Sequence, residues 1–178
     1  MWTIGHSTRS LEALLALLHA HGIRRVTDVR RFPRSRRHPQ FNTDALARDL
    51  PAAGIAYGHR PALGGFRRPR RDSRNTGWRN ASFRGYADYM ETDAFAAELD
   101  ALLEEARAAP TAIMCAEAVP WRCHRSLISD ALVARGVEVR HILGPAPAEP
   151  HALTAGARVE GRRPIYPGEP DLFGAAGD

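Results

Sequence analysis

The stretch Met114-Cys-Ala-Glu-Ala-Val-Pro-Trp-Arg-Cys-His-Arg125 decides the predicted fold, because it joins a short apolar run to a helical pattern. The apolar run over residues 111–114 is typical of a buried strand, and apolar residues at helical spacing from Leu127 to Leu132 predict a helix that begins near Ser126. A strand that leads into a helix is the unit of an open α/β sheet, which binds ligands at the carboxyl ends of its strands. Both cysteines of the chain lie in this stretch, so reactive chemistry is first sought here.

The same alternation of strand and helix extends over most of the chain. Further strands are predicted over residues 2–5, 23–29, 55–59 and 137–143, with helical patterns between most of them. We therefore expect one Rossmann-like, three-layer α/β domain over residues 1–143, with about five mainly parallel strands. Residues 144–178 are rich in proline and glycine, and we expect them to form a C-terminal tail that is partly disordered or packed on the body.

The composition limits the class of protein and points to an anionic partner. The chain has 178 residues, 44% of them hydrophobic, and no apolar run long enough to span a membrane, so we expect a cytoplasmic protein with no membrane partner. All 25 basic residues are arginines, which excludes lysine chemistry such as Schiff-base formation. Residues 24–84 hold 16 arginines and four acidic residues, whereas residues 85–178 hold eight and 15. This asymmetry makes a phosphate-bearing partner, a nucleotide or nucleic acid, the first to consider, and the equal alternative is a solvated basic surface.

Titratable side chains recur where the predicted strands end. They are His6, Asp28, His59, Cys115 with Glu117, and His141. Because the carboxyl ends of parallel strands meet at one edge of a sheet, we expect these side chains to share one site. The alternative is that each is separately solvated or hydrogen-bonded for structural reasons.

Two residues of the central stretch are candidates for direct catalytic roles. Glu117 is the best general acid or base, because a carboxylate in a partly apolar pocket can exchange protons near neutral pH; its alternative role is to brace loop amides. Cys123 is a candidate nucleophile, activated by the helix N-terminus and by Arg125, with His124 or His6 as its proton partner. The alternative for each cysteine is an inert buried thiol.

A zinc site is also considered. Cys115, Cys123 and His124 could be joined as ligands by His6 or His59, but the spacing of the two cysteines matches no standard ligand pattern. We therefore predict no cofactor and keep zinc as a minor alternative.

Two arginine clusters provide candidate binding residues. The first cluster is expected to clamp phosphate oxygens and comprises Arg30, Arg34, Arg36 and Arg37, with Arg125, Gln40 and Asn42 nearby. The second combines charge with stacking surfaces suited to nucleic-acid bases and comprises Arg67, Arg68, Arg70, Arg71 and Trp78, with Phe66 and Phe83.

Several motifs in a fixed order resemble one family. They are Thr3-Ile-Gly-His-Ser7, Asp28-Val-Arg30 followed by Pro33-Arg-Ser-Arg36 and Pro39-Gln-Phe-Asn42, Gly54-Ile-x-Tyr-x-His59, Leu63-Gly-Gly65, Tyr89-Met90, Met114-Cys-Ala-Glu117 and Cys123-His-Arg125. Together they resemble the domain of unknown function 488 family, over residues 3 to 143. The resemblance implies a small Rossmann-like domain with a shared polar site, and it brings no agreed reaction.

A looser likeness concerns mechanism. Asp28-Val-Arg30, with a strand that ends at Cys115 and leads to Cys-His-Arg-Ser126, resembles the layout of rhodanese-type sulfurtransferases and cysteine phosphatases. Those enzymes surround an anion with backbone N–H groups, whereas this loop contains Glu117 and no glycine, which disfavours the same arrangement here. In the tail, Pro170-Asp-Leu-Phe173 resembles the end of the peptide that docks DNA-repair proteins on the sliding clamp, with Glu169 where glutamine is usual.

These observations lead to three hypotheses. The first is an enzyme, a hydrolase or transferase, that acts on a phosphate-bearing substrate, with Glu117 as general acid or base and arginines as the phosphate clamp. The second is a rhodanese-like or redox enzyme that uses the thiols of Cys115 and Cys123. The third is a non-catalytic module that binds nucleic acid or acts as an adaptor.

Overall fold

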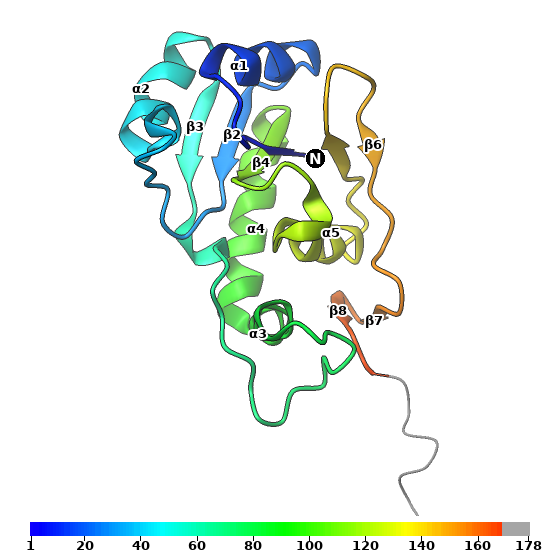
Figure 1. Ribbon diagram of the computed structural model, residues 1–178. Helices are drawn as coiled ribbons and strands as arrows, with labels where there is room; N and C mark the ends of the chain where they lie inside the picture. The colour runs from blue at the N-terminus through cyan, green and yellow to red at the C-terminus, as the bar shows by residue number, and fades with distance from the viewer. Residues whose placement is uncertain (169–178) are drawn as a thin grey trace, which may run out of the picture.

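The computed structural model describes residues 1–168 and places a six-stranded sheet at the centre of the protein (Figure 1). The strands are β1 (Trp2–Gly5), β2 (Arg25–Asp28), β3 (Ala56–His59), β4 (Thr111–Cys115), β5 (Arg140–Ile142) and β6 (Glu149–Pro150), in the spatial order β3-β2-β4-β1-β5-β6. The first five pair in parallel, and β6 pairs antiparallel with β5. The expected α/β fold with a mainly parallel sheet is confirmed.

Helices cover both faces of the sheet. One hydrophobic cluster joins the sheet to α1 (Leu11–Ala20) and α2 (Thr43–Ala52), and a second joins it to α3 (Ala81–Met90), α4 (Asp93–Ala108) and α5 (Arg125–Val133). Single turns of 3-10 helix lie at η1 (Pro39–Phe41), η2 (Pro61–Leu63) and η3 (Pro120–Arg122). Strand β4 is buried along its whole length and serves both layers. Ala112 and Met114 point into the first cluster, whereas Ile113 and Cys115 point into the second, as the period of a strand requires.

Side-chain caps fix where several helices begin. Ser10 accepts a hydrogen bond from the backbone N–H of Ala13 at the start of α1, and Thr92 accepts one from Phe95 at the start of α4. Asn80 caps α3, so this helix begins at Ala81. These caps satisfy backbone groups that would otherwise lack partners.

Residues 144–168 pack on the body of the domain. The β6 segment extends the sheet, and β7 (Arg158–Glu160) and β8 (Arg163–Ile165) form a small hairpin. Asp130 of α5, which is fully buried, accepts hydrogen bonds from His151 Nε2 at 2.8 Å and from the Tyr166 hydroxyl at 2.7 Å. The sliding-clamp-like motif at 170–173 lies outside the described residues.

Within residues 1–168, no helix is long and apolar enough to cross a membrane.

Gly5 brings the loop after β4 close to the end of β1. A Cβ atom at this position would lie 1.7 Å from the carbonyl oxygen of Glu117. The backbone N–H groups of His6 and Ser7 donate to the carbonyls of Cys115 and Ala116 at 3.0 and 2.9 Å. The first residues of the loop after Cys115 therefore cross directly over β1, and a side chain at Gly5 would push them away.

Gly5→Ala should destabilise the protein by about 2–3 kcal/mol or more, because the added methyl group must displace backbone. Chemical denaturation at equilibrium measures this change. Gly144→Ala is the matched control, because a Cβ atom there meets nothing within 4 Å, and its effect should stay within about 0.5 kcal/mol. Equal stability of the two variants would contradict the described path of the loop.

Candidate functional site

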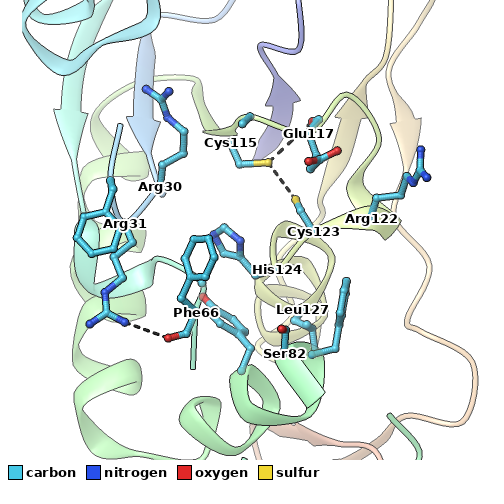
Figure 2. Close-up of a pocket in the computed structure, with 15 residues that line it drawn as sticks. Arg30, Arg31, Phe66, Ser82, Cys115, Glu117, Arg122, Cys123, His124 and Leu127 are labelled. Atoms are coloured by element: carbon cyan, nitrogen blue, oxygen red, sulfur yellow. Dashed lines mark hydrogen bonds between the residues drawn. The ribbon is translucent and has the colours of Figure 1, made fainter. Parts of the chain in front are cut away.

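A cavity of about 400 Å³ opens at the carboxyl ends of β2 and β4 (Figure 2). The segment after β2 contributes Arg30, Arg31 and Phe32, and the segment after β4 contributes Cys115 and Glu117. Cys123 and His124, which immediately precede α5, also line the cavity. Aromatic side chains of the long 64–86 segment, Phe66, Phe83 and Tyr86, form the opposite wall.

The two cysteines face each other at this cavity. Their Sγ atoms lie 2.9 Å apart, both thiols are free, and both side chains are buried (Figure 2). A hydrogen bond from the Cys123 thiol, with a smaller contribution from the charge of Arg125, lowers the pKa of Cys115 against the opposing effect of burial. The same hydrogen bond and burial raise the pKa of Cys123. These opposite shifts favour Cys115 as the thiolate of the pair and Cys123 as the thiol that donates to it.

Arg125, the first residue of α5, supports this assignment. Its side chain is 1% exposed, and Nη2 donates to the carbonyls of Glu117 at 3.1 Å and Ala118 at 3.2 Å. Across residues 1–168, no carboxylate lies within salt-bridge distance of this guanidinium, and Nε and Nη1 have no hydrogen-bond partner. A buried cation without a counter-ion is costly, so negative charge on the neighbouring thiol pair is favoured, and the charge of Arg125 acts to lower the pKa of both cysteines.

A second network stands beside the cavity. Asp28 is fully buried, and its carboxylate accepts from Arg30 Nε at 2.9 Å, from Arg30 Nη2 at 2.5 Å and from the Tyr57 hydroxyl at 3.0 Å. Arg30 Nη1 lies 3.0 Å from His6 Nε2, and burial together with the charge of Arg30 lowers the pKa of His6 to about 4. His6 is therefore neutral and accepts from Arg30. Most of the N–H donors of Arg30 bond to groups inside the protein and so hold the cavity wall in place. Its expected role in binding phosphate stays a prediction.

Two further histidines brace the segment after β2. His59 Nε2 donates to the carbonyl of Arg30 at 2.8 Å, and His124 Nε2 donates to the carbonyl of Val29 at 2.9 Å. Burial lowers the pKa of His124, so its ring is neutral and Nδ1 remains an acceptor. A Cβ atom at Gly65 would approach this Nδ1 to 3.2 Å, and glycine there leaves it open.

Glu117 contributes mainly through its backbone. Its carbonyl accepts from Arg125 and lies 3.9 Å from the Cys115 thiol, whereas its side chain is exposed at the rim of the cavity. The apolar pocket that would make its carboxylate a general acid does not surround it.

The arginines of the expected phosphate clamp do not lie together. Arg30 lies at the cavity and Arg125 beneath the loop after β4, whereas Arg34, Arg36 and Arg37 are exposed and do not line the cavity. Gln40 Nε2 donates to the carbonyl of Arg9 at 3.2 Å, and Asn42 Oδ1 accepts from the N–H of Ser35 at 2.6 Å, so both side chains hold loop backbone.

Sequence reasoning missed two arginines, Arg31 and Arg122, that line the cavity. Arg31 is adjacent to Arg30 and Arg122 is adjacent to Cys123, and this adjacency could have indicated that both lie near the site. The sequence does not show, however, in which direction a loop side chain points. Cys115 was considered for thiol and zinc chemistry but was not placed among the expected catalytic residues.

The second arginine cluster lies on the 64–80 loop. Arg68 and Arg71 are exposed, whereas Arg70 pairs with Glu91 at 3.1 Å and the Arg67 guanidinium lies 3.8 Å from the centre of the Tyr89 ring. Trp78 stacks on Phe83 with ring centres 4.8 Å apart, so its ring packs internally. Nucleic-acid binding by this loop stays a prediction.

The remaining predicted residues are His141 and the possible zinc ligands. His141 lies in a separate chain of hydrogen bonds, 2.7 Å from Thr3 Oγ1 and 2.9 Å from His151. Over residues 1–168, no three His, Cys, Asp or Glu side chains are grouped as metal ligands would be. Zinc therefore stays a minor alternative that rests on the types of residue alone.

The thiol assignment predicts a pH profile for alkylation of Cys115. Because the thiolate is the nucleophile, a lowered pKa shifts the onset of the reaction with iodoacetamide to lower pH. Cys123→Ala removes the donor, so the pKa of Cys115 should rise and the profile should move to higher pH. Cys123→Ser keeps a hydroxyl donor and should shift the profile less. Rates measured by mass spectrometry test this order, and identical profiles for the three proteins would contradict it.

The Asp28 network predicts a large effect of a nearly isosteric change. Asp28→Asn removes the charge opposite Arg30 in a buried place and should cost about 3–5 kcal/mol of stability. Asp49→Asn is the matched control, because Asp49 pairs with Arg48, whose side chain is 73% exposed, and it should cost at most about 1 kcal/mol. Denaturant titration compares the two. Similar small losses would mean that Arg30 does not depend on Asp28.

Comparison with known proteins gives one result that bears on this site. No curated protein and no solved structure matches the chain. The model of the family described as "Domain of unknown function DUF488" matches residues 10–132, which include most of the cavity-lining segments. The match covers more than half of the chain and agrees with the motifs around the two cysteines, so this protein belongs to the DUF488 family.

Proposed function

We propose that this protein is an enzyme whose reaction begins with attack of the Cys115 thiolate on an anionic substrate and ends with formation of a bond between Cys115 and Cys123. The observation that carries the proposal is the contact of the two free thiols, 2.9 Å apart, at the edge of a cavity large enough for a small molecule. The lowered pKa of Cys115 and the raised pKa of Cys123 favour Cys115 as the nucleophile and Cys123 as the resolving residue.

The reaction is a two-electron reduction of a substrate that contains a sulfur–sulfur bond. The Cys115 thiolate attacks one substrate sulfur, the S–S bond breaks, and the other half leaves as a thiolate. A mixed disulfide now joins Cys115 to the first half. Cys123 then attacks Cys115 Sγ, giving its proton to the thiolate that leaves, and the enzyme ends as the Cys115–Cys123 disulfide. A thiol reductant returns the pair to the dithiol state.

Charge at the cavity supports an anionic substrate. Arg31 and Arg122 line the cavity, and neither belongs to an ion pair within residues 1–168. Arg125, beneath the loop after β4, adds a buried positive charge. We therefore keep the expectation of an anionic substrate, but its charged group can be a phosphate or another anion.

Two observations favour thiol chemistry over the alternatives. The Glu117 carboxylate is exposed, whereas a general acid that acts near neutral pH needs a more apolar environment. In the loop after Cys115, the carbonyls of Glu117 and Ala118 are directed at Arg125. A cradle of N–H groups, as in the cysteine phosphatases, is not supported by this loop, and the second thiol favours oxidation and reduction over phosphoryl transfer.

Trapping of the intermediate tests this proposal. The reduced full-length protein is mixed with a small disulfide and followed by intact mass spectrometry. The unaltered protein should end as the internal disulfide, Cys123→Ser should accumulate a mixed disulfide on Cys115, and Cys115→Ser should form no rapid adduct. Glu117→Gln separates the alternatives, because it should give the same product as the unaltered protein if the thiols act. A first adduct on Cys123, or failure of the unaltered protein to form the internal disulfide, would contradict the proposal.

A further inference from the structure

The mouth of the cavity exposes aromatic surface that the fold itself does not use. Four large hydrophobic side chains are strongly exposed within residues 1–168, and two of them, Phe32 at 71% and Phe66 at 80%, line this cavity. Exposed aromatic rings at the opening of a cavity are typical of ligand sites, because the ligand covers them when it binds.

Phe66 is held in place by its backbone. Its φ is 62°, in the left-handed region that side chains rarely adopt, and its carbonyl accepts from Arg31 Nη1 at 3.0 Å. Gly64 lets the turn pass tightly over the same arginine, because a Cβ there would lie 2.7 Å from the Arg31 backbone nitrogen. Strain of this kind persists only where the surroundings fix it, and it recurs at functional sites. The backbone therefore fixes Phe66 at the mouth of the cavity before any ligand binds.

The inner wall is also aromatic and offers few polar groups. Phe83 and Tyr86 line it together with Leu127. The Tyr86 hydroxyl is buried and donates to the carbonyl of Leu63 at 2.6 Å, so this residue presents its ring and not its hydroxyl to the cavity. A flat ring would gain contact with this wall and lose few hydrogen bonds to water.

The charged groups lie at the rim. Figure 2 shows Arg31 and Arg122 on opposite sides of the cavity, with the thiol pair and His124 between them. Glu117 is the acidic residue of the lining, and three arginines line the same cavity. A ligand with an aromatic body and an anionic substituent would match both the wall and the rim.

We propose that the substrate is a small molecule in which a flat aromatic or heteroaromatic ring with an anionic group is bonded to the sulfur–sulfur bond that Cys115 attacks. This inference rests on the proposed thiol function and adds the chemical class of the substrate. The ring would lie against Phe66 and Phe83, and the anion would meet Arg31 or Arg122. The aryl thiolate is a good leaving group because it is weakly basic, and with this substrate the proton that Cys123 loses when the internal disulfide forms passes to solvent.

A set of four disulfides tests the two parts of this inference. The anionic aromatic compound is 5,5′-dithiobis(2-nitrobenzoate), the neutral aromatic one is 2,2′-dithiodipyridine, the neutral aliphatic one is bis(2-hydroxyethyl) disulfide, and the cationic one is cystamine. Each rate constant with the reduced full-length protein is divided by the rate constant of the same disulfide with a short cysteine peptide, which removes intrinsic reactivity. The normalised rate should be highest for the anionic aromatic disulfide, by about tenfold or more over the neutral aliphatic one.

Matched variants assign the preference to residues. Phe66→Leu should lower the normalised rates of both aromatic disulfides by about three- to tenfold, and Trp121→Leu, an exposed aromatic residue outside this cavity, should not. Arg31→Gln should lower the rate of the anionic disulfide by a similar factor of about three to ten, and Arg107→Gln, an equal change of charge on α4, should not.

The outcomes separate this inference from the proposed function. Equal normalised rates for all four disulfides, with Cys115 reacting rapidly in each case, would overturn the aromatic and anionic substrate and leave the thiol function standing. Faster reaction of cystamine would overturn the charge assignment. Failure of Cys115 to react with any of them would overturn the thiol function itself, and this inference with it.

Discussion

The buried guanidinium of Arg125 is the constraint on which the site depends. It lies at the first turn of α5, is 1% exposed, and has no carboxylate partner among the described residues. Two loop carbonyls accept hydrogen bonds from one of its nitrogens, and these bonds fix the path of the chain between β4 and α5. Its positive charge is left to be balanced by the thiol pair, because a cation in a place of low dielectric favours the ionised form of a neighbouring acid. Arg125 therefore fixes the loop and also adds to the effect of the Cys123 hydrogen bond, which is the larger cause of the lowered pKa of Cys115.

The geometry of the sheet brings the reacting groups to this charge. Strand β4 is the central strand between β2 and β1, so Cys115 at its end lies next to the segments that follow both neighbours. The segment after β2 is held by Asp28 from one side and by two histidines that donate to its carbonyls from the other. Gly5 lets the loop after β4 fold across β1, and this turn returns Cys123 to a distance of 2.9 Å from Cys115. Several polar residues that were catalytic candidates thus hydrogen-bond to the walls of the cavity, and the proposed chemistry is assigned to the two thiols.

The sequence predicted the fold and the general position of the site, but not how its side chains pair. Parallel strands could be located because buried apolar runs such as 111–115 alternate with helical patterns, and the family motifs pointed to the same residues. The contact of Cys115 with Cys123 depends on how a seven-residue loop crosses a neighbouring strand, which no local pattern encodes. Arg34 and Arg31 belong to one basic run, yet only Arg31 of the two lines the cavity, because the direction of a loop side chain is set by tertiary contacts. His141 was expected at the site, but β5 lies beyond β1 from β4, and the histidine joins a different network there.

The central claim is that Cys115 carries a negative charge that balances Arg125 and that Cys123 stays protonated beside it. The most direct measurement is an ultraviolet titration of thiolate absorbance in the folded protein, with the Cys115→Ser variant subtracted to isolate one thiol. The account predicts a single thiolate that ionises below the ordinary thiol pKa of about 8.5 and disappears in Cys115→Ser. A midpoint at or above that value, or a low-pH thiolate that persists in Cys115→Ser, would contradict it.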